Sequence, residues 1–222
     1  GGNPPKPGEI SLAHHGVLFL DELPEFHRNV LETLREPLES GMVCISRAAI
    51  QTEFPAQFQL LAAMNPCPCG QWGNPKAECL CTPDRISRYL AKLSAPLLDR
   101  IDMQITVNAL SEEELVKPNE NTPGQSILLR QKVLETQFRQ TNRQGCLNAH
   151  LNAKECEIVC ALGSKEQAFL NLILQRLKLS ARAFHRLLKV ARTIADIRCE
   201  SDVNLTDLQQ ALSFKQTLQA PK

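Results

Sequence analysis

The chain has 222 residues, a length that suggests one or two domains. With 43% hydrophobic residues it can bury a core, and 25 Lys and Arg against 24 Asp and Glu leave a net charge of +1. No overall charge therefore draws it to nucleic acid or to a membrane surface. No apolar run approaches the roughly 18 residues of a membrane span, and we expect no signal peptide in the first residues. The nine cysteines, an odd number, favour the reducing cytoplasm over a secreted disulfide framework.

The first predicted elements belong to an α/β domain. Residues 16–20 form a continuous apolar run that ends on Asp21 and Glu22, and a strand that is apolar on both faces is typical of the middle of a parallel sheet. Over residues 26–38 the apolar side chains recur at helical spacing, and Gly41 suits the position after a helix.

Beyond this predicted helix the apolar residues recur at every second position, as in a strand. Apolar and β-branched residues alternate over residues 43–54, on either side of the pair Ala48-Ala49, which predicts a hairpin. We expect a second buried strand over residues 58–64 and a third strand over residues 103–107. Between them we expect a helix over residues 82–93, in which Thr82 is the N-cap and Pro83 the first helical residue.

The second half of the chain has a different composition. Residues 111–125 are polar and contain Pro, Asn and Gly, which indicates a linker. Helical patterns follow, among them a long amphipathic helix that Ser180 would cap. We therefore expect an α/β domain over residues 1–110, a linker over residues 111–125 and an all-α domain over residues 126–222.

Two polar sites follow the predicted buried strands. Asp21 and Glu22 end the first strand, and open α/β sheets bind ligands at the carboxyl ends of their strands. In phosphoryl-transfer sites the first carboxylate helps to hold Mg²⁺ and the second can deprotonate a water. The alternative is a helix whose first turn favours acids. Asn65, after the second strand, could bond a water or a γ-phosphate, or could merely turn the chain before Pro66.

Two arginines are further candidates. Arg100, flanked by Asp99 and Asp102, forms either a local ion pair or an arginine finger that neutralises charge on a transferring phosphoryl group. Arg182 lies in the first turn of the predicted Ser180 helix, where a cation opposes the helix dipole and needs a compensating anion. A bound phosphate or a nearby Glu would supply that anion.

Four features follow one another along the chain: the acidic pair Asp21-Glu22, then Asn65, Arg100 and Arg182. With these features in this order, the chain resembles the Mg-chelatase-like group of AAA+ ATPases, in its ComM/YifB branch. The likeness covers nearly the whole chain and includes the approach to Walker B, Walker B itself, sensor 1, the arginine-finger segment and the sensor 2 helix. The matching segments are residues 7–14, 16–26, 62–70, 96–102 and 180–197.

The resemblance implies a partial AAA+ P-loop NTPase core with a parallel sheet and a β-hairpin insert, followed by an all-α lid domain. It implies ATP and Mg²⁺ as cofactors. Asp21 would support Mg²⁺, Glu22 would activate water and Asn65 would sense the γ-phosphate. Arg100 would reach the ATP of a neighbouring subunit, and Arg182 would act as sensor 2, also across the interface.

One departure from the family is large, because these residues contain no G-x-x-x-x-G-K-[ST] loop to cradle the phosphates. In the family that loop lies upstream of the segment that matches Gly1. We therefore expect the chain to be the C-terminal portion of a longer protein, and not to hydrolyse ATP by itself.

Four cysteines form two C-x-C pairs: Cys67 with Cys69, and Cys79 with Cys81. Four thiolates this close in sequence could complete a tetrahedral zinc site. The alternative is four reduced thiols in a loop that packs Trp72. The other five cysteines are expected to be small core residues; they are Cys44, Cys146, Cys156, Cys160 and Cys199.

The resemblance also implies a homo-hexameric motor that drives branch migration on DNA during natural transformation. The sequence offers two contacts to a DNA backbone: Arg47 beside the predicted hairpin turn, and Lys6 in the Pro-rich segment before the first strand. Most basic residues of the helical half are expected on a solvated helix face; they are Arg139, Arg143, Arg176, Lys178, Arg186, Lys189 and Arg192.

Two alternatives remain open from the sequence. The first is a chelatase-type motor that inserts metal or remodels a protein partner, with the same fold and site. The second is a non-catalytic, zinc-binding interaction module, for which replacement of Glu22 would change nothing.

Overall fold

A computed structural model describes residues 4–47, 50–107, 124–177 and 179–215. The chain divides into two compact units, with the boundary between Ile101 and Asp102.

The first unit contains a two-stranded parallel sheet of β1 (Val17–Leu20) and β4 (Gln59–Ala62). Both strands lie within the predicted ranges. One face of the sheet packs against a cluster of buried leucines that includes Leu31 and Leu97. Along both strands these side chains alternate with exposed ones, so the expectation of strands buried on both faces is wrong for the described residues.

Short helices follow β1. They are the 3₁₀ turn η1 (Leu23–Glu25), α2 (Arg28–Glu32) and α3 (Pro37–Ser40), with α1 (Glu9–Leu12) preceding the strand. The predicted single helix over residues 26–38 is therefore divided into two. Pro37 explains the division, because it has no N–H to continue the ladder and instead occupies the first turn of α3.

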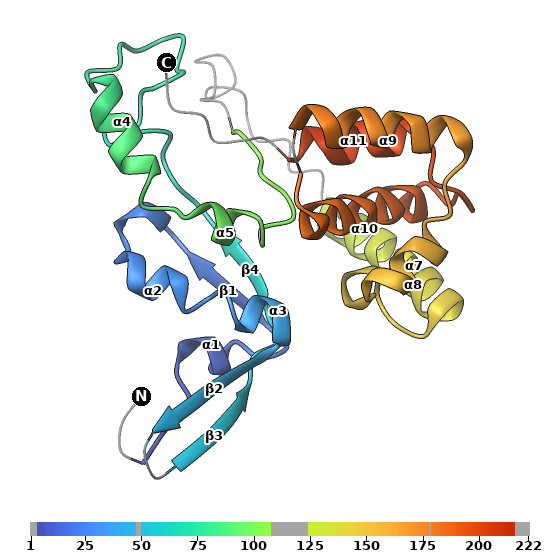
Figure 1. Cartoon of the computed structure of the whole chain (residues 1–222), viewed down its shortest axis with the longest axis horizontal. Helices are drawn as coiled ribbons and strands as arrows, with labels where there is room; N and C mark the ends of the chain where they lie inside the picture. Colours follow the sequence, from blue (N-terminus) through green and yellow to red (C-terminus); the bar gives the residue numbers. More distant parts are fainter. Residues whose placement is uncertain (1–3, 48–49, 108–123, 178, 216–222) are drawn as a thin grey trace. The chain divides into compact units, whose positions relative to one another are not determined.

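The hairpin consists of β2 (Met42–Arg47) and β3 (Ile50–Pro55), which pair antiparallel with Met42 opposite Pro55. It extends away from the parallel sheet as a separate ribbon (Figure 1). The predicted hairpin is confirmed, although its central pair, Ala48-Ala49, lies outside the described residues.

Two helices complete the first unit, α4 (Pro83–Leu90) and α5 (Ala95–Leu98). The Thr82 hydroxyl accepts a hydrogen bond from the Arg85 amide and caps α4, as the Thr-Pro pattern predicts. The predicted third strand over residues 103–107 is wrong, because these residues have neither helix nor strand. Val107 is 88% exposed, and apolar alternation alone cannot supply a pairing partner.

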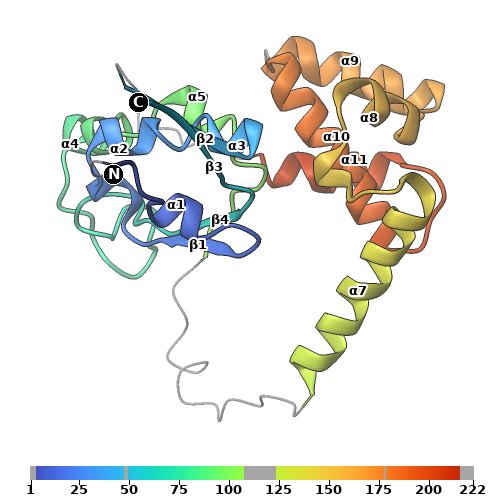
Figure 2. The same ribbon diagram turned by 90° about the horizontal axis from the view of Figure 1, so that it is seen from below.

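The described residues of the second unit form helices and no strand, as expected for an all-α domain. Its elements are α7 (Gln125–Gln144), η2 (Asn148–His150), α8 (Ala153–Val159), α9 (Ser164–Leu177), α10 (Ala181–Ile197) and α11 (Leu205–Ser213). Helix α10 contacts α7, α8 and α11, and the first half of α7 extends beyond the other helices of the unit (Figure 2). Nearly all of the predicted linker, residues 111–125, lies outside the described residues.

A buried polar network joins α7, η2 and α10. The Asp196 carboxylate, 2% exposed, accepts hydrogen bonds from Arg143, Arg192 and Asn148. The expectation of a solvated helix face is therefore wrong for Arg192, which is 1% exposed and also donates to the carbonyl oxygens of Glu200 and Ser201. Lys178, placed on the same predicted face, lies outside the described residues.

The cluster of buried leucines against the sheet allows a prediction about the stability of the first unit. Leu31→Ala should lower the free energy of unfolding of the first unit by about 2–5 kcal/mol, because Leu31 is 1% exposed and its loss leaves a cavity. Val30→Ala, one residue away at 51% exposure, is the matched control and should cost less than about 1 kcal/mol. Urea unfolding followed by the fluorescence of Trp72, the single Trp of the chain, measures both. Equal effects of the two substitutions would contradict this placement of the core.

Candidate active site

The carboxyl ends of β1 and β4 lie side by side because the two strands are parallel. Beyond the strands, the Ala63 amide donates to the Leu20 carbonyl at 2.9 Å, and the Leu23 amide donates to the Ala63 carbonyl at 3.0 Å. These two bonds enclose Asp21 and Glu22. The acidic pair is thus fixed against the segment that leads from β4 to Asn65, at one edge of the sheet.

Glu22 has an uncommon backbone conformation. Its φ of 50° and ψ of 46° lie in the left-handed region, which a residue with a Cβ rarely adopts. The Asp21 carboxylate accepts the Glu22 amide at 2.9 Å, and the Glu22 carbonyl accepts the Glu25 amide at 2.7 Å. Backbone strain of this kind is concentrated at functional sites. Both carboxylates are exposed, so an external ligand can reach them.

Asn65 is exposed and follows β4 by three residues. Its backbone hydrogen-bonds to Tyr89 of α4, which partly offsets the increase that burial causes in the pKa of the Tyr89 hydroxyl. The charges of Glu25, of Cys67 and, least of these three, of Glu22 add to that increase in the pKa of Tyr89. Tyr89 therefore lies near Asn65 and near the acidic segment that contains Glu22.

Arg100 belongs to the same unit, but its guanidinium is buried within the chain. It donates to the carbonyl oxygens of Arg35 and Pro96 and forms an ion pair with Glu39 at 2.6 Å. The Arg100 side chain is 6% exposed. In this conformation the structure has an ion pair, which sequence reasoning gave as the alternative to an arginine finger, and Glu39 is an acid that forms it.

Arg182 lies in the second unit, in the first turn of α10, and is exposed. The predicted cap is present, since the Ser180 hydroxyl accepts the Ala183 amide at 3.1 Å. The structure therefore groups Asp21, Glu22 and Asn65 at one edge, and has Arg100 and Arg182 in other surroundings.

The four cysteines of the C-x-C pairs come together. Their sulfur atoms all lie within 4.8 Å of one another. Hydrogen bonds lower the pKa of the Cys69 thiol to about 6. The largest effect comes from the Gln71 backbone, and the second largest comes from the Cys67 side chain. The expectation for the remaining cysteines is confirmed for the buried Cys156 and Cys160, and is wrong for Cys44 and Cys199, which are exposed.

Sequence reasoning missed Glu39 and Tyr89. Glu39 lies 61 positions from its partner Arg100, and no local pattern relates the two. Tyr89 did carry a signal, because it is the single Tyr of the chain and lies on the apolar face of a helix that the sequence predicts.

Comparison with known proteins identifies the family to which this chain belongs. Residues 1–115 match the family described as magnesium chelatase, subunit ChlI, and residues 124–215 match its C-terminal family. The chain belongs to the Mg-chelatase-like family of AAA+ ATPases, in its ComM/YifB branch. Its fold is a partial AAA+ core with a small parallel sheet, followed by a helical domain.

Several individual proteins are similar to this chain in sequence. The chain is 50% identical to competence protein ComM of Haemophilus influenzae and 47% identical to YifB of Escherichia coli, in each case over 97% of this chain and 42% of the relative. An MCM-type protein of Methanocaldococcus jannaschii is 31% identical over 49% of the chain and 14% of that protein. The chain thus spans less than half the length of these relatives. Among the described helices, none is both long and apolar enough to cross a membrane.

Proposed function

We propose that the chain carries the water-activating and phosphate-sensing part of an ATP-hydrolysing, hexameric motor that acts on branched DNA. The observation that carries this proposal is the parallel pairing of β1 with β4, because it brings the acidic pair and Asn65 to one sheet edge. The proposed setting is the cytoplasm, where ATP is available and thiols stay reduced.

The carboxylates suit a magnesium nucleotide. Mg²⁺ prefers hard oxygen ligands and binds proteins through one or two carboxylates together with substrate phosphates. Asp21 is the proposed carboxylate toward Mg²⁺, which when bound would neutralise charge on the phosphates. Glu22, held by its left-handed backbone, would accept the proton of the attacking water. Asn65 would donate its side-chain amide to the γ-phosphate.

The two arginines have proposed roles at subunit interfaces. Arg100 as an arginine finger requires its guanidinium to exchange Glu39 and the two backbone carbonyls for a neighbouring subunit's phosphate. Arg182, exposed at the start of α10, would donate hydrogen bonds to a phosphate near the helix N-terminus. A Gly-rich phosphate loop would come from outside residues 1–222, in keeping with the 42% of the relatives' length that the chain spans.

DNA as the substrate is supported by the name of the Haemophilus influenzae relative, competence protein ComM, and by the extended β2–β3 hairpin. Arg47 is the last residue of β2, beside the hairpin turn, and Lys6 is exposed in the segment before α1. In a ring, such hairpins would place positive charge along a DNA backbone without reading bases.

The test uses the protein expressed with the coding sequence that precedes residue 1. We expect ATP hydrolysis to increase severalfold with a four-way DNA junction, to increase less with a linear duplex of the same length, and to lose this stimulation as salt rises. The 222-residue chain alone should hydrolyse ATP at the background rate. Hydrolysis that no DNA changes would contradict the DNA substrate and would favour a chelatase-type motor with a protein or metal-insertion partner.

A further inference from the structure

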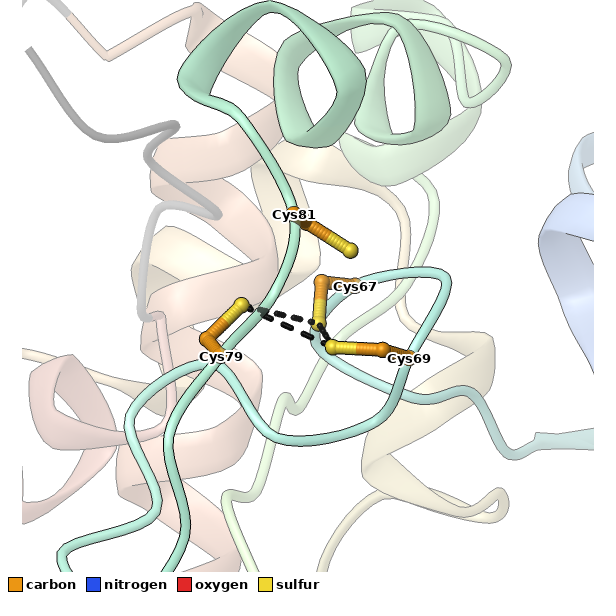
Figure 3. A group of neighbouring side chains, drawn as sticks. All are labelled: Cys67, Cys69, Cys79 and Cys81. Carbon is orange, nitrogen blue, oxygen red and sulfur yellow. Dashed lines mark hydrogen bonds between the residues drawn. The ribbon is translucent and has the colours of Figure 1, made fainter.

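The strongest unassigned feature of the described residues is the group of four cysteine sulfurs (Figure 3). Cys67 and Cys69 come from the loop that follows β4, and Cys79 and Cys81 come from the segment that enters α4. The Sγ atoms of Cys67 and Cys69 are 3.3 Å apart, and the Sγ atom of Cys79 is 3.7 and 3.6 Å from them.

These separations suit a tetrahedral metal centre. A Zn–S bond of about 2.3 Å places the sulfurs of a tetrahedral site about 3.8 Å from one another. The Trp72 amide donates to the Cys67 sulfur at 3.3 Å, the kind of backbone bond that stabilises a thiolate ligand. With four protein ligands no coordination position remains open, so the site is suited to a structural metal and not to a catalytic one.

The surrounding loop gives an independent argument. Residues 63–82, between β4 and α4, contain neither helix nor strand. Loops of this length without secondary structure are uncommon in compact domains unless they have a function or are held in place. Cys67, which is fully buried, packs with Ile86, Tyr89 and Leu90 of α4, and the other three cysteines pack around this cluster.

We propose that Cys67, Cys69, Cys79 and Cys81 bind one structural Zn²⁺ ion that ties the loop after Asn65 to the start of α4. Cys67 lies two residues beyond Asn65, and Cys81 precedes Thr82, the N-cap of α4. Tyr89 of the same helix packs in one cluster with Cys67. The ion therefore acts as a positioning device for Asn65. This consequence rests on the proposed function, whereas metal binding itself does not.

Elemental analysis of the 222-residue chain, purified without added metal or chelator, tests the binding. We expect about one zinc per chain, and less than a tenth of that in Cys67→Ser and in Cys79→Ser. Cys44→Ser and Cys199→Ser are matched controls, since both cysteines are exposed and distant in sequence from the cluster, and they should retain the metal.

Cobalt provides a readout that does not depend on how the variants fold. Co²⁺ exchanged into the unaltered chain should give the visible absorption of a tetrahedral tetrathiolate site, and one equivalent of Zn²⁺ should abolish it. Folded, metal-free protein that does not take up cobalt would overturn the proposal. So would iron in place of zinc, or a disulfide within the cluster, detected as two fewer alkylatable thiols.

The positioning role is tested separately in the protein that carries its upstream segment. Removal of zinc with a chelator, followed by addition of excess Mg²⁺, should lower ATP hydrolysis at least tenfold, and added Zn²⁺ should restore it. Glu22→Gln should retain the full zinc content. Loss of hydrolysis in Glu22→Gln, together with unchanged hydrolysis after zinc removal, would refute the positioning role and leave the ATPase proposal intact. If no hydrolysis occurs under any condition, the ATPase proposal fails, and the zinc content still decides the metal site.

Discussion

Glu22→Gln is expected to lower ATP hydrolysis by about 10²–10⁴-fold, the usual effect of removing a positioned general base. The amide keeps the size of the side chain and cannot accept the proton of the attacking water. ATP binding should persist, because Asp21 and Asn65 are unchanged. Steady-state hydrolysis and equilibrium binding of a fluorescent ATP analogue, in the protein with its upstream segment, give the two quantities.

Glu25→Gln is the matched control for this experiment. Glu25 lies three residues further along the same turn, is exposed, and pairs only weakly with Lys92 at 3.4 Å. The change in charge is identical, so a general electrostatic effect would lower both rates alike. We expect the hydrolysis rate of Glu25→Gln to stay within about twofold of the unaltered protein, as for a surface substitution. Equal loss in both variants, or full activity of Glu22→Gln, would contradict the assignment of the base.

Asp196→Ala should lower the free energy of unfolding of the helical unit by about 3–5 kcal/mol, the cost of breaking a buried ion pair from one side. Asp196 is 2% exposed and is the common acceptor for Arg143, Arg192 and Asn148. Its loss leaves the Arg192 guanidinium buried without its carboxylate. Asp202→Ala is the control, because Asp202 is exposed and bonds to the adjacent Ser201 hydroxyl. Urea unfolding followed by circular dichroism at the helical band compares the two.

The same network gives the stability a defined pH dependence. Burial alone would raise the pKa of Asp196, but hydrogen bonds from Arg143 and Asn148 and the nearby arginine charges hold it below its ordinary value of 3.8. The stabilisation is therefore fully present above pH 3.8 and is lost as the pH falls through the lower, folded-state pKa. Asp196→Asn should show a smaller loss of stability in this acid range. An acid dependence equal to that of the unaltered chain would contradict the network.

The sequence predicted the parts of the fold that depend on local pattern. The strand before Asp21, the hairpin, the capped helix at Thr82 and the two C-x-C pairs need only neighbouring residues, and all four are present in the structure. The position of Asn65 and the acidic pair at one edge of the sheet also follows from pattern, because parallel strands bring their carboxyl ends together.

The rest depends on contacts between residues far apart in the chain. The burial of Arg100 depends on Glu39, and that of Arg192 on Asp196 together with carbonyl oxygens beyond the end of α10. A charged residue in the sequence indicates solvent exposure unless its partner is known, which explains the incorrect assignment of Arg192 to a solvated face. For Arg100 the sequence leaves a local ion pair and an arginine finger open, and it does not identify Glu39 as the partner. Residues 103–107 show the converse case, in which β-like alternation has no partner strand among the described residues.

The small parallel sheet also determines how the isolated chain should behave in solution. Val17, Phe19 and Leu61 are each more than half exposed on one face, and in the described residues each strand has a single hydrogen-bonded neighbour. Open strand edges beside exposed apolar side chains recruit other chains and promote aggregation. A molecular mass measured on these 222 residues would therefore combine edge-to-edge association with any closed ring. The dependence of this mass on protein concentration distinguishes the two, because a closed ring stops at a fixed number of subunits. Edge-to-edge pairing has no such limit, so the mass would continue to increase as the concentration rises.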